Sequence, residues 1–407
     1  MTSAGTSAFT PSSRVRRIKV SPSTAAAARV RELKAQGRPI LDLTVGEPDF
    51  DTPRHIKDAA IAAIEAGETK YTSVNGTPEL RAAIRERMLR ASGVEYPDAA
   101  ITVGGGGKQI IFLAFTASLD EGDEVIIPAP YWVSYPDMVR ANDGTPVIVE
   151  TDPAAGYRLT PELLREAITE RTKWLVLNTP GNPTGVAYSR KELEGLAEVL
   201  REAPHVRVLT DEIYDEIYFG EGRMVGLAEA APEIRDRVFT VNGVSKSYAM
   251  TGWRLGYGVG DPELIRAVNL LQSQTSSCPS SISQAAAAAA LTGDQECVSR
   301  CVEVYRQRRD RALEMIAGIE GLEAVVPDGA FYLFVGCSGL IGRRTPEGGT
   351  LENDQDVTLY LLESANVAVI QGSAYGTEPF FRMSYATGLE TIEAALEAVG
   401  EAVGRLD

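Results

Sequence analysis

The chain has few of the residues that form disulfide frameworks and metal centres. Its 407 residues include 4 cysteines and 2 histidines, His55 and His205. The cysteines show no Cys-x-x-Cys spacing, so we expect neither a disulfide-stapled fold nor a histidine-based metal site. Cys297 and Cys301 lie four positions apart, on one face of any helix that contains them, and we interpret them as a structural pair of small apolar residues.

Long apolar runs and an excess of basic residues are also missing. No run of 18 apolar residues occurs, so no segment is expected to cross a membrane. The 56 acidic residues outnumber the 40 basic ones and give a formal charge of −16. A surface with this balance repels phosphate backbones, so we do not expect nucleic acid as a partner. An anionic ligand must therefore be held by local positive groups.

The first 31 residues contain no acidic group and are rich in Ser, Thr, Ala and Arg, a composition that superficially suggests a transit peptide. They also lack the apolar core of a secretory signal. From about Arg14 onward the segment has the character of a mature protein. We therefore expect residues 1–13 to be a flexible tail on a cytoplasmic protein.

Seven short apolar runs alternate with longer helical patterns between residues 100 and 260. Most of the runs lack the alternation of a half-buried strand, which predicts a largely parallel seven-stranded sheet with helices on both faces. The runs are residues 100–103, 124–127, 146–149, 173–177, 206–209, 238–241 and 256–259. The predicted fold class is therefore α/β.

The pattern of apolar and charged residues changes after residue 293. Residues 294–321 predict a long, charged helix, and the stretches 330–335, 367–370 and 381–385 predict strands before a last helix. Residues 336–356 have no periodicity and are expected to form a surface loop. We expect a smaller α/β domain built from both chain termini, residues 14–50 and 301–407, beside a large domain of residues 51–300.

Polar clusters follow four of the predicted strands. They are residues 104–108, 178–185, 211–214 and 242–246. Ligands of open α/β sheets bind at the carboxyl ends of the strands, so four clusters at one edge predict a binding site. The alternative explanation is that loops are polar in general. It accounts for any single cluster better than for all four together.

Lys246 follows the predicted strand 238–241 and is surrounded by small or polar residues. An amine in a dry crevice loses its proton near neutral pH and attacks an aldehyde, which makes Lys246 a candidate Schiff-base lysine for pyridoxal phosphate. The alternative is a solvated loop lysine, the commoner situation for this residue type.

Asp211 and Tyr214 follow the strand 206–209. A buried carboxylate needs a cationic partner, and a protonated pyridine nitrogen is such a partner. Tyr214 is placed to hydrogen-bond the phenolic oxygen of the same ring. The alternative for Asp211 is a helix cap.

Residues 104–108 form a glycine-rich segment that opens a helix, where unpaired backbone N–H groups suit a phosphate. The segment matches no nucleotide fingerprint, so a simple tight turn remains open. Arg254 offers a bidentate partner for the same phosphate, or a surface ion pair.

Asn182 lies in a rigid turn with two X-Pro bonds, at Pro180 and Pro183, either of which is a candidate for the cis form. The turn would fix the Asn182 amide near the cofactor, or serve structure alone. Trp132 offers a flat face for stacking on a heteroaromatic ring, although a core position is the commoner case for Trp.

Taken together, these motifs resemble those of class I (fold type I) pyridoxal-phosphate-dependent aminotransferases, in particular the prokaryotic aspartate aminotransferase branch. The resemblance runs from about Arg14 to the C-terminus. Its marks are residues 46–50 (GEPDF), 70–72 (KYT), 130–136 (PYWVSYP), 182–185 (NPTG), 211–214 (DEIY), 245–254 (SKSYAMTGWR) and 382–386 (RMSYA).

The resemblance assigns a role to each candidate residue. Lys246 would bind the cofactor covalently and move the substrate α-proton, and Asp211 would pair with the ring nitrogen. Many members carry a phosphate-binding Ser where this chain has Gly243, and Ser245 is the candidate to replace it. Asn182 and Tyr214 would bond the ring oxygen, and Trp132 would stack on the ring. The phosphate would be held by Gly107, Lys108, Arg254 and, from a second subunit, Tyr71.

The resemblance also implies the substrate contacts and a homodimer with shared active sites. Arg382 would bind the substrate α-carboxylate, and Gly46 would line the same pocket, beside Trp132 and Asn182. Lys108 resembles a lysine thought to hold the distal carboxylate of a dicarboxylic substrate. Lys19 corresponds to a residue that affects whether prephenate is accepted. Both lysines could instead face solvent.

The leading hypothesis is transamination between L-aspartate and 2-oxoglutarate. A second hypothesis keeps the cofactor and changes the substrate to aspartate and prephenate, or to neutral or aromatic amino acids. A third, non-enzymatic hypothesis is a cofactor-sensing regulator built on the same fold. The regulator would need a DNA-binding segment, and both the acidic charge and the short stretch before the resemblance begins count against it.

Overall fold

The computed structural model describes residues 9–407 of the chain. The first eight residues of the predicted tail lie outside that range, and the first helix, α1 (Ser13–Arg16), begins at the tail's predicted end. None of the helices in residues 9–407 combines the length and the apolar character that a membrane crossing requires.

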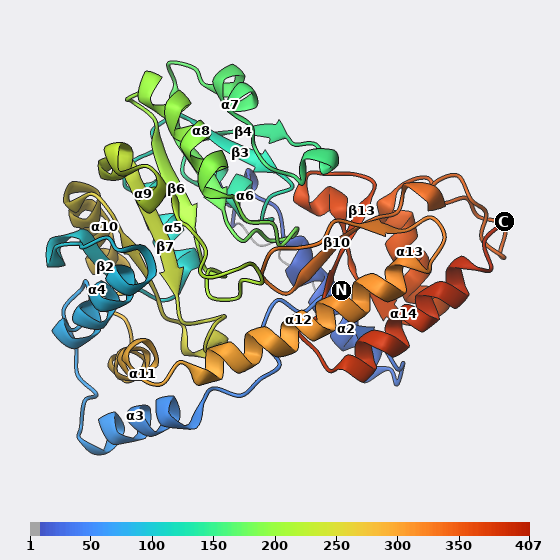
Figure 1. Cartoon of the computed structure of the whole chain (residues 1–407), viewed down its shortest axis with the longest axis horizontal. Coiled ribbons are helices and arrows are strands. Elements are labelled where there is room, and N and C mark those ends of the chain that lie inside the picture. Colours follow the sequence, from blue (N-terminus) through green and yellow to red (C-terminus); the bar gives the residue numbers. More distant parts are fainter. Residues whose placement is uncertain (1–8) are drawn as a thin grey trace, which may run out of the picture.

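The seven predicted strands form one sheet (Figure 1). Its spatial order is β2-β8-β7-β6-β5-β3-β4, and only β8 runs antiparallel to its neighbours. The strands are β2 (Ile101–Gly104), β3 (Glu124–Ala129), β4 (Thr145–Glu150), β5 (Thr172–Asn178), β6 (Arg207–Asp211), β7 (Val238–Gly243) and β8 (Gly256–Val259). The predicted α/β class with a mostly parallel sheet is confirmed.

Both faces of this sheet are covered by helices, which explains why its strands read as continuous apolar runs. In β3, Ile126 packs on one face with α8, and its neighbours Val125 and Ile127 pack on the other face with α5 and α10. Alternate residues of a strand point to opposite faces, so each must be apolar when both faces are buried. The helices of this region are α3 (Arg54–Glu65), α4 (Pro78–Ser92), α5 (Gly107–Thr116), α6 (Tyr135–Ala141), α7 (Pro161–Ala167), α8 (Arg190–Glu202), α9 (Leu227–Ala230), α10 (Pro262–Thr275) and α11 (Ser281–Thr292).

Local signals in the sequence set several helix boundaries. Ser189 and Glu192 form a capping box at the start of α8, because each side chain accepts a hydrogen bond from the other residue's backbone N–H. At the start of α4 the Thr77 side chain accepts a hydrogen bond from the Leu80 N–H, and the helix ends at Gly93 in the left-handed conformation.

A second group of elements packs beside the large sheet. A four-stranded sheet has the order β12-β13-β10-β9, and β1 (Leu41–Asp42) pairs in parallel with β11 (Val367–Ala368). The other strands are β9 (Glu323–Ala324), β10 (Tyr332–Gly336), β12 (Ile370–Gln371) and β13 (Phe380–Ser384), and the helices are α2 (Pro22–Ala35), α12 (Glu296–Ala317), α13 (Asp354–Ala365) and α14 (Leu389–Val403).

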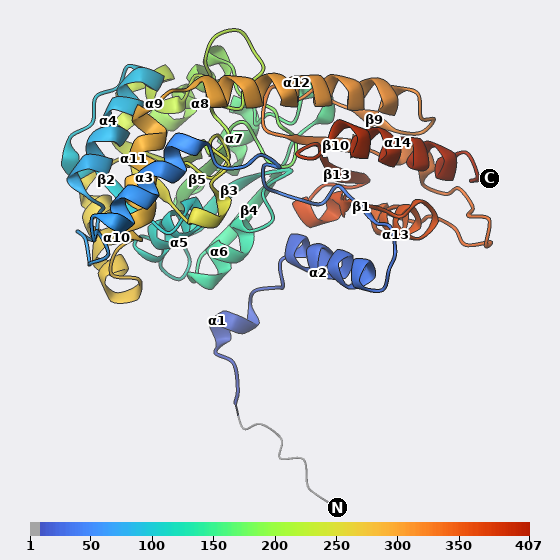
Figure 2. The same ribbon diagram turned by 90° about the horizontal axis from the view of Figure 1, so that it is seen from below.

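The long helix α12 runs from the α11 side of the large sheet to α13 and α14 (Figure 1). The predicted domain boundary after residue 300 falls inside this helix. Seen from below, α1 lies under α6 and α2 lies under the second group of elements (Figure 2), where Val30 and Leu33 of α2 pack with Ile40 and Ala368. Residue boundaries at 50 and 300 stay a prediction.

Two local predictions in this region were wrong in detail. The stretch 367–370 is not one strand but two short ones, β11 and β12, in different sheets. The predicted loop 336–356 contains a 3-10 turn, Ser338–Leu340, and runs into α13, whose cap Asn353 accepts a hydrogen bond from the Asp356 N–H. A single apolar run cannot reveal a change of partner strand inside it.

Candidate active site

The four polar clusters predicted from the sequence converge on one cavity of about 580 Å³. Each cluster contributes to its lining: Gly107 and Lys108 from α5, Asn178 and Asn182 from the turn after β5, Asp211 and Tyr214 from the end of β6, and Ser245 and Lys246 from the loop after β7. The opposite wall comes from the second group of elements and includes Gly46, Tyr332 and Arg382. The cavity therefore lies at the carboxyl edge of the parallel strands.

Lys246 is enclosed by aromatic rings and backbone. Its ammonium group donates a hydrogen bond to the Gly46 carbonyl and lies 5.9 Å from the centroid of the Tyr214 ring and 5.8 Å from that of Phe331. Burial lowers the pKa of Lys246 to about 8, although the nearby Glu47 carboxylate opposes this shift. A substantial fraction of the amine is therefore neutral near pH 7 to 8, as a nucleophile or a base requires.

Asp211 is buried and faces the cavity from the end of β6. Its Oδ2 accepts a hydrogen bond of 2.7 Å from the Tyr135 hydroxyl, and its Oδ1 accepts one of 3.3 Å from the Ile213 N–H. Burial raises the pKa of Asp211 to about 6, and the Tyr135 bond limits that rise. Neither partner is charged, so this buried carboxylate can accept a cationic ligand group.

The start of α5 and Arg254 together form an anion cradle. Gly106 caps the helix with a φ of 101°, no side chain makes a capping hydrogen bond there, and no acceptor in residues 9–407 pairs with the N–H groups of Gly107 and Lys108. A Cβ on Gly106 would lie 2.5 Å from Arg254 Nη2, so glycine permits this close approach. Arg254 donates to the carbonyls of Thr251 and Gly105, at 2.9 and 3.1 Å, which directs its guanidinium to the helix end.

Arg382 is a buried cation that lacks an anionic partner. It is 2% exposed and donates to the Asn182 side-chain oxygen at 3.1 Å and to the Thr44 carbonyl at 2.6 Å. Its Nε has no hydrogen-bond partner, and it makes no ion pair within residues 9–407. Its guanidinium carbon lies 4.3 Å from the Tyr332 ring centroid. A buried, unpaired guanidinium at a cavity wall is suited to bind a carboxylate.

The remaining ring-side candidates are held by neighbours within the cavity wall. Tyr214 shares a 3.0 Å hydrogen bond with the Tyr332 hydroxyl. The Asn182 N–H donates to the Asn178 side chain at 2.7 Å, and both X-Pro bonds of its turn are cis. The Lys108 ammonium lies 4.6 Å from the Trp132 ring centroid, and burial followed by the nearby Arg254 lowers the pKa of Lys108.

Two predicted site residues lie away from this cavity within the single chain. Tyr71 is 90% exposed in the loop between α3 and α4. Lys19 is exposed before α2, and its N–H donates to Asp137 at 3.4 Å. The sequence prediction assigned Tyr71 to a second subunit, which a single chain does not test.

Several residues at the site were given no role by sequence reasoning. Tyr135 bonds Asp211, Glu47 accepts a 2.7 Å hydrogen bond from Thr251, and Tyr332 contacts both Tyr214 and Arg382. Arg31 of α2 also lines the cavity. Tyr135 and Glu47 belong to quoted motifs, 130–136 and 46–50, so their place in a motif was the available signal.

Comparison with known proteins assigns the chain to a family. The family described as Aminotransferase class I and II matches residues 38–399. An aspartate aminotransferase of Rhizobium meliloti (strain 1021) is 50% identical over 98% of this chain and 97% of its own length. A probable aspartate/prephenate aminotransferase of Rickettsia felis is 48% identical over 97% of each chain.

Solved structures agree with the sequence relatives. The crystal structure of the aspartate aminotransferase from Rhizobium meliloti superposes with a TM-score of 0.96 at 50% identity, covering 98% of this chain and all of that one. The Thermus thermophilus aspartate aminotransferase with maleate gives a TM-score of 0.90 at 41% identity, covering 97% of this chain and all of that one. The protein belongs to the class I and II aminotransferases, enzymes of fold type I that use pyridoxal phosphate to move amino groups between amino acids and 2-oxo acids.

Proposed function

We propose that this aminotransferase transfers the amino group of L-aspartate to 2-oxoglutarate and forms oxaloacetate and L-glutamate. The observation that carries the proposal is the pairing, in one cavity, of the partly neutral Lys246 amine with the buried and anion-free Arg382. The first group handles a proton, and the second binds a carboxylate.

The cavity residues fit pyridoxal phosphate. The unpaired N–H groups of Gly107 and Lys108 with Arg254 would hold the phosphate, and Asp211 would pair with the ring nitrogen. Asn182 and Tyr214 would contact the ring oxygen, and Trp132 would stack on the ring. The bound cofactor would supply a covalent attachment point for the amino group and a sink for electrons. Ser245, buried beside Lys246, is the candidate for the phosphate contact that Gly243 cannot make.

Lys246 would then act as the base that removes the proton from the α-carbon of the substrate. Its hydrogen bond to the Gly46 carbonyl holds the amine at the cavity wall, and its low pKa keeps part of it neutral. Tyr135 would keep Asp211 oriented toward the ring. These residues bind, orient and move protons, and the surrounding aromatic rings exclude water.

Substrate choice would follow from the positive groups. Arg382 would bind the α-carboxylate, with Gly46 beside it, and Lys108 would hold the distal carboxylate of a dicarboxylic substrate. The names of the relatives support this, since the two described solved structures are both called aspartate aminotransferases and one carries the dicarboxylate maleate.

A second candidate function is the use of prephenate as well as aspartate. The Rickettsia relatives are named probable aspartate/prephenate aminotransferases at 46 to 49% identity, which is close to the identity of the Rhizobium relative. Lys19 is the residue that the resemblance connects with this choice. An aminotransferase for neutral or aromatic amino acids would not need the Lys108 cation.

We also propose a cytoplasmic homodimer in which Tyr71 completes the phosphate site of the partner. A tyrosine that is 90% exposed, in a loop outside its own cavity, is available for such a contact. In this arrangement a monomer would lose one phosphate ligand.

The experiment that tests the function follows the absorbance of the purified protein before and after addition of aspartate. We expect the band of the bound cofactor to change with aspartate and to be restored by 2-oxoglutarate. A Lys246→Ala variant should lose the change and nearly all transamination, by roughly a thousandfold or more. Steady-state rates with aspartate, prephenate, alanine and aromatic donors separate the substrate alternatives. Retained turnover of aspartate by Lys246→Ala would defeat the assignment.

A further inference from the structure

A second cavity lies behind the loop that carries Asp211 and Tyr214. It has a volume of about 400 Å³ and is bounded by the C-terminal end of α4, the loop after β6 and the N-terminal end of α12. We call it the Arg87 cavity. Glu212, the residue after Asp211, lines the Arg87 cavity and not the active-site cavity. The two cavities therefore share one short segment of chain.

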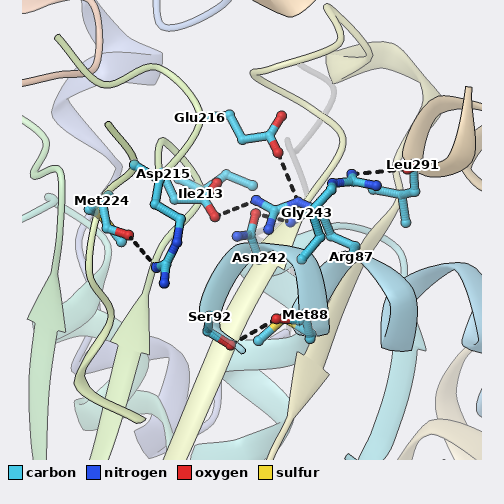
Figure 3. Close-up of polar contacts among 12 residues, drawn as sticks. Arg87, Met88, Ser92, Ile213, Asp215, Glu216, Met224, Asn242, Gly243 and Leu291 are labelled. Atoms are coloured by element: carbon cyan, nitrogen blue, oxygen red, sulfur yellow. Dashed lines mark hydrogen bonds and ion pairs between the residues drawn. The ribbon is translucent and has the colours of Figure 1, made fainter. Parts of the chain in front are cut away.

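Arg87 is the deepest cation of this cavity and is already paired. Its side chain is 4% exposed, and it forms ion pairs with Asp215 at 2.5 Å and with Glu216 at 2.9 Å. Figure 3 shows Arg87 between these two carboxylates. These two carboxylates neutralise the charge of Arg87, so Arg87 does not pair with a further acid.

Two acids of the cavity, Glu212 and Asp215, have carboxyl oxygens that no basic side chain of residues 9–407 holds. Glu212 is 7% exposed and makes no ion pair within residues 9–407. The Asp215 side chain is 10% exposed, and its Oδ1 is buried without a hydrogen-bond partner. Burial and the nearby Asp215 carboxylate raise the pKa of Glu212 to about 8, so this acid is largely protonated near pH 7 and would ionise when a cation binds beside it.

The other basic side chains of the cavity have partners elsewhere. Arg90 donates to the Leu291 carbonyl at 3.2 Å, and its charge acts on Glu216. Arg223 pairs with Glu229, which also receives Arg190. The acceptors at the base of the cavity are thus left for a ligand that brings its own positive charge and N–H donors.

Apolar side chains form the rest of the wall. Met88, Met224, Ala228 and Val298 line the cavity and are 5 to 7% exposed. They suit an aliphatic stem attached to a charged head, and the volume falls in the range of small-molecule sites.

We propose that the Arg87 cavity is a binding site for a small organic cation, with a guanidinium or ammonium head on Asp215 and Glu212 and an aliphatic stem along the methionines. Glu212 directly follows Asp211, so the site would connect to the cofactor-binding strand end through one peptide bond.

The test uses n-propylguanidinium as the probe and isothermal titration of the cofactor-loaded protein. A guanidinium does not condense with aldehydes as an amine does, so it does not react at the active site. Saturating succinate keeps the active-site cavity filled. We expect one site per chain, and at least tenfold weaker binding of N-propylurea, the neutral isostere.

Variants locate the probe. Asp215→Asn should weaken binding about tenfold or more, because it removes the charge that faces the head group. Ser299 is exposed at the rim, so Ser299→Lys should fold normally and weaken binding about threefold through repulsion, while Ser299→Gln should leave it unchanged.

Three results would overturn the proposal. They are equal binding of propylurea, probe binding that is seen only when succinate is left out, and absence of binding up to about 10 mM probe, a concentration that leaves even weak millimolar sites largely filled. If Asp215→Asn fails to fold, the Ser299 pair decides alone, and equal affinities of its two members would then count against the site.

Discussion

Arg382 and Arg87 are both buried arginines next to a cavity, and they differ in their partners. Arg87 holds two carboxylates, whereas Arg382 holds only an amide oxygen and a carbonyl and keeps one N–H unpaired. A buried guanidinium is costly without an anion. Carboxylates of the protein itself therefore neutralise Arg87, whereas Arg382 is free to bind the carboxylate of a ligand.

The same contrast applies to the acids of the two cavities. Asp211 shares its cavity with Asp42, Glu47 and five basic side chains, whereas Glu212 lies beside Asp215 and Glu216 around Arg87. The strongest charge effect on the pKa of Asp211 comes from the Lys246 cation, and the strongest on the pKa of Glu212 comes from the Asp215 carboxylate. The active-site cavity attracts the carboxylates and phosphate of its ligands in a protein whose formal charge is −16.

Replacing each arginine by methionine should separate the two roles most strongly. Arg382→Met should lower kcat/KM for aspartate by at least about a hundredfold, because a carboxylate contact is lost, and should change the free energy of unfolding by less than about 1.5 kcal/mol. Arg87→Met should lower that free energy by about 3–5 kcal/mol, because it leaves two buried acids unpaired. Urea unfolding and aspartate kinetics on both variants provide the measurements. Similar stability losses in the two would contradict the comparison.

A change at Lys108 tests how the active-site cavity recognises a dicarboxylic substrate. Lys108→Ala should reduce kcat/KM for aspartate by about tenfold to a hundredfold and for alanine much less, because only aspartate carries a distal carboxylate. Lys108→Gln is the matched control, since it keeps a polar side chain, one bond shorter, without the charge. An equal loss for aspartate and alanine would show that Lys108 does not read that carboxylate.

Tyr135 tests how Asp211 is held. Tyr135→Phe removes one hydrogen bond to Asp211 and should lower kcat about tenfold, since a bond to a charged group contributes about 1.5–3 kcal/mol. The pKa of Asp211, which this bond keeps down, should rise. Cofactor absorbance and rate as functions of pH measure both effects, and an unchanged pH profile would argue against a positioning role.

The smallest effect concerns pH. Only the neutral amine attacks an aldehyde, and the pKa of Lys246 is about 8. The rate at which cofactor-free protein takes up pyridoxal phosphate should therefore rise with pH through a midpoint near 8 and level off about one pH unit above it. Glu47→Gln should move this midpoint downward, since Glu47 is the neighbour that most favours the charged amine. A rate that still rises steeply beyond pH 9 would mean that the amine is not desolvated.

Much of this site could be predicted because its signals are local. Lys246, Asp211 and Asn182 each follow a continuous apolar run, and the parallel arrangement brings such strand ends together. Contacts between distant segments could not be predicted this way. Tyr135 and Asp211 are 76 positions apart and Arg87 and Asp215 are 128 apart, so no spacing rule connects them.

The family resemblance predicted a carboxylate ligand for Arg382, but no sequence pattern predicted the ion pairs of Arg87. Only the fold shows which protein groups each arginine contacts. The change of sheet partner between β11 and β12 was missed for a similar reason, because pairing depends on strands that are remote in the chain.

The most direct measurement identifies the residue that carries the cofactor. The purified protein is treated with borohydride, which fixes a bound aldehyde to its amine, and is then digested and analysed by mass spectrometry. The account predicts a phosphopyridoxyl adduct on Lys246 alone among the lysines. An adduct on Lys108 or on another lysine, with Lys246 unmodified, would contradict it.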